Sequence, residues 1–151
     1  MSLAFDIGGS NARYAEGTPE SYDLVELERY DSSMSYDELL SLLQSVIEQS
    51  DPVQVGVSVP GPIHPPGIVS PSEAQSPNIT WENAPLQKDL DQLVEPPVRI
   101  QRDLHCAAQA ILFLEQTETF TLLYPGTGFG YASALDGEVI TGTEDTADEL
   151  A

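Results

Sequence analysis

Apolar side chains recur along this chain at two spacings that alternate from one end to the other. Leucine, isoleucine and valine at intervals of three and four residues predict amphipathic helices over 36–49, from Pro85 through Leu93, and over 104–115. Short apolar or alternating runs predict strands between them. These strands are expected at 3–7, 12–16, 22–30, 53–59, 98–101, 120–124, 131–135 and 138–140.

The boundaries of the predicted helices carry local signals of their own. Ser35-Tyr36-Asp37-Glu38 has the spacing of a capping box, with Ser35 at the cap and Glu38 three residues later. Asp145–Ala151 resembles the first turn of a further helix. The third helix is expected to bury the apolar and small side chains that share one face, namely Ala107, Ala108, Ile111, Leu112 and Leu114.

The connections are of two kinds. Residues 60–82 are rich in Pro, Ser and Gly and are read as one long loop, which is usually functional or mobile in a compact domain. Glycine turns stand at 8–9 and 126–130, and Asp136-Gly137 is a hairpin signal. Three strands, then alternating helices and strands, then a new hairpin predict an α/β fold with a mixed sheet and helices on its faces.

The first glycine turn could hold a phosphate. Gly8 and Gly9 allow a tight turn whose amide N–H groups point at an anion, and the Ser10 hydroxyl adds a donor. Asp6, at the end of the preceding strand, suits Mg²⁺, which takes few carboxylates together with water and phosphate oxygens. The alternative is a plain hairpin whose glycines only make the turn.

The net charge of the chain indicates the salt conditions in which the protein folds. There are 25 acidic residues against five basic ones, a net charge of −20, and the acids are spread along the whole chain. Self-repulsion of this size opposes the compact state at low salt and is screened in molar salt. The composition is typical of cytoplasmic proteins of salt-accumulating halophiles. A mimic of nucleic acid or a binder of basic partners is the alternative, and binding to nucleic acid is not expected without a basic patch.

The cysteine count and the hydropathy of the chain exclude several kinds of site and protein. The one cysteine, Cys106, cannot form an internal disulfide or a multi-cysteine zinc site and reads as a small core residue. No apolar run is long enough to span a membrane, and no secretory signal opens the chain. We therefore expect a cytoplasmic protein without membrane contact.

Six short stretches, in order and over essentially the whole chain, resemble the N-terminal part of ROK-family sugar kinases and the related bacterial glucokinases. They are Asp6–Arg13, Val55–Ile63, Pro77–Trp81, Arg102-Asp103 with Ala107-Ala108, Gly126–Gly130 with Asp136-Gly137, and Ala147–Leu150. The resemblance implies an actin-like, ribonuclease-H-like lobe over residues 1–117 and the start of a second, truncated lobe over residues 118–151.

The resemblance also implies an activity: phosphoryl transfer from ATP, with Mg²⁺, to a hexose or hexose derivative. Asp103 would be the catalytic base, although Asp is also a good helix cap at this place. Asp6 would act on magnesium through water. Cofactor-binding positions would be Asp6, Gly8, Gly9, Ser10, Asn11, Gly126, Thr127 and Gly128. Sugar-binding positions would be Gly61, Asn78, Arg102 and Glu149. The Asn11-Ala12-Arg13 likeness suggests glucose, with N-acetylhexosamines open.

The sequence departs from the family pattern at several points. Arg102 replaces the Asn that precedes the catalytic Asp, and it cannot accept a hydrogen bond. His105 stands where Asn is frequent and is read as a packed or pocket-edge residue. The sugar motif that begins at Ala147 is not completed by Ala151. We therefore expect the 151 residues alone to bind ATP and sugar with millimolar or weaker dissociation constants.

Two alternatives to a kinase follow from the same residues. One is a non-catalytic sugar-binding or regulatory module, which Arg102 favours; only two residues precede the first strand, so a DNA-binding segment before it is not expected. The other is a structural half, or inactive kinase fragment, that pairs with a second polypeptide or with itself as a homodimer.

Overall fold

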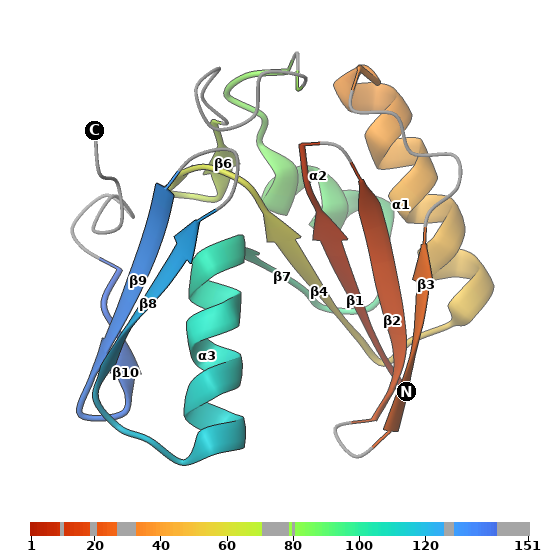
Figure 1. The fold of residues 1–151 in the computed structure, drawn as a ribbon. Helices are drawn as coiled ribbons and strands as arrows, with labels where there is room; N and C mark the ends of the chain where they lie inside the picture. The colour runs from red at the N-terminus through yellow and green to blue at the C-terminus, as the bar shows by residue number, and fades with distance from the viewer. Residues whose placement is uncertain are drawn as a thin grey trace.

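A computed structural model describes residues 1–9, 11–18, 21–26, 33–70, 79, 81–125 and 129–141. Its elements follow one another along the chain in the order shown in Figure 1. They are β1 (Ser2–Ile7), β2 (Ala12–Thr18), β3 (Ser21–Glu26), α1 (Tyr36–Ser50), β4 (Gln54–Val59), β5 (Ile63–His64), β6 (Ile68–Val69), α2 (Leu86–Leu93), β7 (Val98–Arg102), α3 (Asp103–Glu115), β8 (Phe120–Pro125), β9 (Phe129–Leu135) and β10 (Glu138–Val139).

Five strands form a mixed sheet in the order β3-β2-β1-β4-β7. The first three form an antiparallel meander, whereas β4 runs parallel to β1 and β7 runs parallel to β4. Alternation along β1 buries Leu3, Phe5 and Ile7 and leaves the other face of the strand to smaller or polar residues. The predicted mixed sheet with helices on its faces is confirmed.

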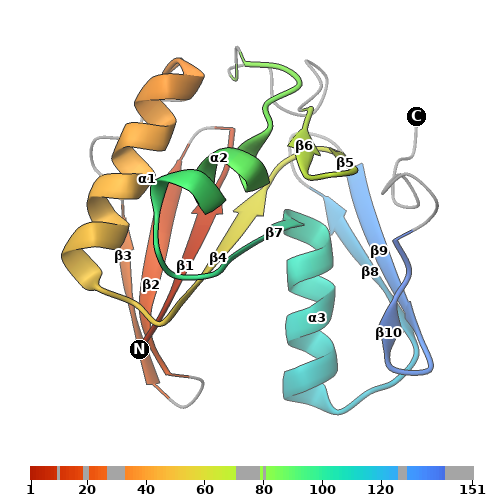
Figure 2. The ribbon, with the colours of Figure 1, turned by 180° about the vertical axis from the view of Figure 1, so that it is seen from behind.

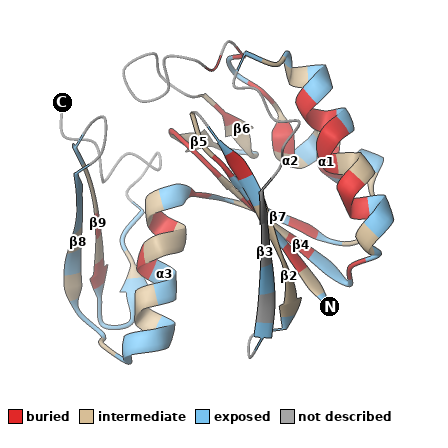
Figure 3. Ribbon diagram, turned by 45° about the vertical axis from the view of Figure 1, so that its right-hand side comes forward, coloured by how far each residue is buried: buried red, intermediate tan, exposed pale blue. Residues whose placement is uncertain are grey.

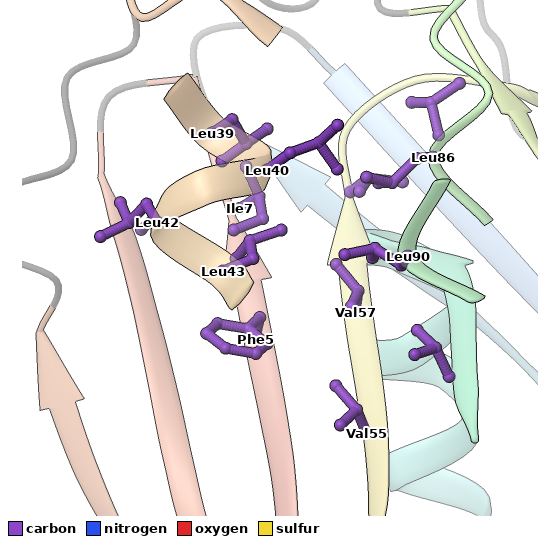
Figure 4. Packing of buried hydrophobic residues seen from close by; sticks show 14 of the residues in the cluster. Phe5, Ile7, Leu39, Leu40, Leu42, Leu43, Val55, Val57, Leu86 and Leu90 are labelled. Carbon is purple, nitrogen blue, oxygen red and sulfur yellow. The ribbon is translucent and has the colours of Figure 1, made fainter. Parts of the chain in front are cut away.

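Helices α1 and α2 cover one face of this sheet, as Figure 2 shows from behind. Ser35 caps α1 with the predicted capping box, in which its side chain and that of Glu38 each accept from the other's backbone. Side chains from the two helices interlock with those of β1 and β4 (Figure 4). The fully buried members of this core include Leu3, Ile7, Leu39, Leu43, Leu86 and Leu90.

A second, three-stranded sheet has the order β10-β9-β8, and α3 packs against β9. Figures 1 and 2 place α3 between the two sheets, away from α1 and α2. Its buried side chains are His105 and Ala108, and β9 contributes Ala132 and Ala134. Much of this region is coloured exposed or intermediate in Figure 3. The predicted domain boundary at residue 117 falls between α3 and β8 and stays a prediction.

The structure corrects two predictions. Residues 60–82 are not one structureless loop, because β5 and β6 form a small hairpin there, and Val69 exchanges two backbone hydrogen bonds with Ala84. Leu114 does not face inward: its side chain is 71% exposed, since the sheet beside α3 does not extend over that face of the helix. The strand predicted over 22–30 is described as β3 up to Glu26.

Two predicted segments cannot be compared with the structure. The helix expected over 145–151 and residues 27–30 of the third strand lie outside the described residues. No helix of the described part is long and apolar enough to cross a membrane.

Candidate active site at the carboxyl ends of three parallel strands

The parallel pairing of β1, β4 and β7 sets the position of the candidate site. Because parallel strands point the same way, their carboxyl ends meet at one edge of the sheet, where ligands bind in many α/β folds. Asp6, the turn Pro60-Gly61-Pro62 and Asp103 all follow or end one of these strands. In Figures 1 and 2 these ends lie at the same level as the first turn of α3 and the end of β8.

Strand register brings polar side chains together on the face opposite α1 and α2. Asp6 pairs with Ser58 of β4, and Ser58 pairs in turn with Gln101 of β7. The buried Val57 and Val59 flank Ser58 and point to the other face. Ser58 Oγ donates a hydrogen bond to Asp6 Oδ1 over 3.2 Å. The end of the sheet therefore presents a carboxylate that is already held in place.

The second oxygen of that carboxylate faces an arginine. Arg13 lies opposite Asp6 in the antiparallel pair of β1 and β2, and its Nε is 3.7 Å from Asp6 Oδ2. The side chains are 49% and 53% exposed, so solvent and a ligand can reach both. A half-exposed ion pair of this kind adds little stability, and its main effect is on the orientation of the carboxylate.

Asp103 is the first residue of α3, and its side chain is exposed. Arg102, the last residue of β7, occupies the cap position, so Asp103 is not itself the cap residue. Asp103 Oδ1 accepts a hydrogen bond from the backbone N–H of Leu104 over 2.7 Å. The helix start fixes this carboxylate locally while leaving it open to a ligand, which is what a proton acceptor needs.

The charges of both carboxylates affect the thiol of Cys106. Burial raises the pKa of the Cys106 thiol to about 11, a hydrogen bond with Ser58 opposes this rise, and the negative charges of Asp103 and Asp6 add to it. Cys106, which the sequence suggested to be a small core residue, is half-buried. Because its charge neighbours include both acids, Asp6 and Asp103 share one region of the structure.

The start of β9 approaches the same place from the other sheet. A Cβ added to Gly130 in β9 would lie 2.5 Å from Leu104 Cδ1. Leu104 follows Asp103 directly, so the start of β9 contacts the first turn of α3. The absence of a side chain at Gly130 is what permits this approach. Gly126, Thr127 and Gly128 lie outside the described residues.

The first glycine turn is closed by its own backbone. Gly8 N donates to Asn11 O over 2.8 Å, and Gly8 and Gly9 are half-buried between β1 and β2. Gly61 is buried after β4 with a φ of 82°, a value that favours glycine over any residue with a side chain. Ser10, between the two strands, lies outside the described residues.

The remaining predicted sugar-binding positions divide into two groups. Asn78 and Glu149 lie outside the described residues. Arg102 is 3% exposed, and its strand position, paired with Val59, lies on the face covered by α1 and α2. His105 is buried in α3, as expected for a packed histidine.

The donor set fits a magnesium ion held mainly by a nucleotide. Asp6 offers hard oxygen ligands at an accessible strand end, and Mg²⁺ usually takes one or two carboxylates with water and phosphate oxygens. Among the described residues, no three His, Cys, Asp or Glu side chains gather in a way that could hold a metal by themselves. A dedicated protein cage is therefore not built from this part of the chain.

Sequence reasoning gave Ser58 no role and Cys106 only a packing role. The signal for Ser58 was available: in a Val-Ser-Val strand the serine points away from the face of the valines. What the sequence did not give was the register that sets Ser58 beside Asp6. For Cys106, only the packing of α3 beside β4 reveals the contact.

Known proteins resemble this chain over nearly its whole length. A model of the ROK family matches residues 2–150. N-acetyl-D-glucosamine kinase of Histophilus somni is 29% identical over 160 residues, which cover 99% of this chain and 51% of that protein. The chain therefore spans about half the length of the curated relatives it matches.

Solved structures share the fold. The ROK hexokinase of Thermus thermophilus superposes with a TM-score of 0.74 at 21% identity, covering 98% of this chain and 51% of that one. A ROK family glucokinase from Streptomyces griseus, solved in complex with glucose and AMPPNP, gives a TM-score of 0.75 at 21% identity over 98% of this chain and 48% of that one. At these identities the likeness establishes that the chain shares the fold of these proteins.

Proposed function

This chain belongs to the ROK family, and we propose that it carries the catalytic base and part of the nucleotide site of an ATP-dependent hexose kinase. The observation that supports this most directly is the convergence of Asp6 and Asp103 around Cys106, at the carboxyl ends of parallel strands. The two acids are the residues to which the family resemblance assigns the metal and the base. The names of the relatives, which are sugar kinases, point to the same reaction.

In the proposed reaction Asp103 accepts the proton of a sugar hydroxyl as that oxygen attacks the γ-phosphorus of ATP. The bond from this phosphorus to the bridging oxygen breaks, and ADP leaves. Phosphoryl transfer depends chiefly on positioning and charge stabilisation, so an accessible, locally fixed carboxylate is sufficient on the side of the base. The Leu104 N–H holds Asp103 for this task. Asp6, through water, would hold Mg²⁺, which when bound neutralises charge on the phosphates.

The turns supply the rest of the proposed site. Backbone groups of Gly8 and Gly9, with Ser10, Asn11 and the turn of Gly126, Thr127 and Gly128, would lie against the phosphates. Gly61, Asn78 and Glu149 would face the sugar. We place N-acetylhexosamines first among the substrates because relatives at 28–29% identity are named N-acetyl-D-glucosamine kinases, with glucose next.

A turnover assay tests this function. The chain, in molar KCl with Mg²⁺ and ATP, is offered N-acetyl-D-glucosamine, N-acetylmannosamine and glucose, and sugar phosphate is measured. We expect Asp103→Asn to lower kcat by about 10²–10⁴-fold, the usual contribution of a general base. Asp136→Asn, in the exposed hairpin of the second sheet, is the matched control and should leave kcat unchanged. Equal turnover by the Asp103 variant would remove Asp103 from its role.

A non-catalytic sugar-binding or regulatory module is the second candidate. It is favoured by Arg102, whose buried cation stands where the family pattern has an Asn that binds a sugar hydroxyl. Sugar binding by the wild-type chain without turnover of any of the three sugars would support this candidate against the kinase. A cytoplasmic location, a homodimer and the absence of nucleic-acid binding stay predictions.

A further inference from the structure

Within the described part of the chain, a helix covers only one face of the three-stranded sheet. Ala132 and Ala134 of β9 are buried on the side of α3. Because side chains alternate along a strand, the odd-numbered residues of β9 point to the opposite face. Leu123 of β8 joins them, since it pairs with Tyr131. Figures 1 and 3 show no described helix on that side.

Large apolar side chains make up most of this uncovered face. Leu123, Phe129 and Leu135 are each more than half exposed, and the alternation of β8 and β9 puts them on the same side of the sheet. Together with Tyr131, they are called the open face here. Exposed apolar groups gathered in this way mark interaction surfaces.

Polar groups on the same side of the sheet are few. Thr121 and Ser133 lie opposite each other, and their hydroxyls are hydrogen-bonded over 3.0 Å. Glu138 pairs with Leu135 on the outer strand β10, so this acid lies at the rim of the open face. Docking on the open face therefore does not bury an acid at its centre.

The open face lies in a part of the chain that carries almost no charge. The protein has 25 acidic and five basic residues, yet Glu115 and Glu118 are the only charged residues from 104 to 135. The acids elsewhere repel an acidic partner and attract a basic one to other surfaces. The open face therefore fits a partner that is apolar and uncharged where it docks.

A second copy of this chain supplies such a partner. A two-fold axis through the open face sets it against the same face of the other copy, so apolar side chains meet apolar side chains. The five-stranded sheets, which lie beyond α3 in Figure 1, then stand at opposite ends of the pair. The repulsion between two chains of net charge −20 is smallest in this arrangement.

We propose that two copies of this chain associate through the open face and form a homodimer in which the three-stranded sheets stack on each other. Strand rise and spacing give the face a footprint of about 20 by 15 Å, which is small for a protein interface. The dimer is therefore weak, with a dissociation constant of about 10⁻⁶–10⁻⁴ M. Asp103 begins α3 on the other side of the sheet, so the proposed active site stays accessible.

Sedimentation velocity in molar KCl measures this association without nucleotide or sugar. At this salt the screening length is about 3 Å, so charge repulsion between the copies is largely suppressed. We expect the wild type to pass from monomer to dimer as its concentration rises through the expected dissociation constant. Leu135→Glu, which sets an unpaired charge into the interface, should weaken the dimer by about 100-fold. A wild type that stays monomeric over the whole range overturns the proposal.

Two further variants identify the surface. Phe113→Glu adds the same charge at an exposed apolar position of α3, outside the open face, and should dimerise like the wild type. An equal loss of dimer in Phe113→Glu and Leu135→Glu overturns the assignment to the open face. Leu123→Glu lies on β8, the outermost strand of the sheet, and should weaken the dimer as Leu135→Glu does. If only Leu123→Glu acts, the copies pair through the edge of β8, and stacking of the faces is overturned.

A distance measurement tests the geometry while the apolar side chains of the open face stay in place. In a Cys106→Ser background, which removes the one native cysteine, a spin label is attached at Ser133→Cys or at Ser41→Cys. Stacked sheets lie about 10 Å apart, so labels at position 133 of the two copies should be within about 30 Å of each other. Labels at position 41, on an exposed site of α1, should be farther apart. Shorter distances from position 41 than from position 133 overturn the proposed interface.

Discussion

The two sheets of this molecule are stabilised in different ways. The five-stranded sheet packs large aliphatic side chains against α1 and α2, and Leu3, Leu43 and Leu90 are 0–1% exposed. The three-stranded sheet meets α3 through Ala108, Ala132 and Ala134, which bury much less apolar surface. Phe113 and Leu114 of α3 remain 71% exposed.

The difference indicates where the stability of the fold resides. Burial contributes about 25 cal/mol per Å² of apolar surface, so a core of leucines outweighs a contact made by alanines. The first sheet has its own core, whereas the second depends on the close approach of backbones. Asp103 lies where the two regions meet, at the start of α3.

Removing a leucine from the larger core should produce the largest effect. Leu43→Ala in α1 is expected to lower the free energy of unfolding by about 2–5 kcal/mol, through lost burial and the cavity left behind. Urea denaturation in molar KCl measures it. Leu114→Ala deletes the same atoms from an exposed site and should change stability by no more than about 0.5 kcal/mol. Similar losses in the two variants would contradict the comparison.

Enlarging a buried alanine tests the second sheet. Ala132→Leu in β9 should cost about 1–3 kcal/mol, because its fully buried position has no room for a larger side chain. Ala110→Leu, at an exposed position of α3, is the control and should be close to neutral. If Ala132→Leu were neutral as well, the packing of β9 on α3 would be looser than described.

Removing the cap of α1 should lower the free energy of unfolding by a smaller amount. Ser35→Ala loses one partner of the capping box and is expected to cost about 1 kcal/mol. The loss would appear as a lower urea midpoint with an unchanged slope. Ser41→Ala, an exposed serine in the same helix that donates to Asp37 O, serves as its control. A capping loss no larger than that of the control would show that the start of α1 is frayed.

Alkaline pH tests the boundary between the two regions. The pKa of Cys106 is raised in the fold to about 11, so the unfolded chain releases this proton first. The stabilisation is therefore complete below the ordinary pKa of a thiol and is lost as the pH rises toward about 11. Comparing urea midpoints of the wild type and Cys106→Ser across that range isolates the thiol. An identical pH dependence in both would contradict the raised pKa.

The sequence predicted the elements well where periodicity and local chemistry agreed. The alternation of Leu3, Phe5 and Ile7 and the capping box at Ser35 depend on neighbours in the chain, and both are found as expected. The small hairpin of β5 and β6 was missed because two-residue strands have no periodicity to detect. Leu114 was placed inward because helical spacing gives a face but not the extent of what covers it.

The site was less accessible to the sequence because it depends on contacts between distant segments. Asp6 was proposed from its place before the first glycine turn, and Asp103 by resemblance. Their common neighbourhood follows from strand order and from the position of α3. Ser58 required the register between β1 and β4. The approach of Gly130 to Leu104 required the placement of the second sheet beside α3.

Because Asp6 pairs with Ser58 across two strands, the site depends on the register of β4 against β1. Side chains on a strand alternate between faces, so deleting one residue within β4 would bring a valine to the carboxylate and push the serine into the leucine core. Changes of chain length that leave this edge of the sheet intact are therefore confined to connections outside the candidate site, such as the one from α1 to β4. A library of single-codon deletions would show β4 as an interval in which none is tolerated.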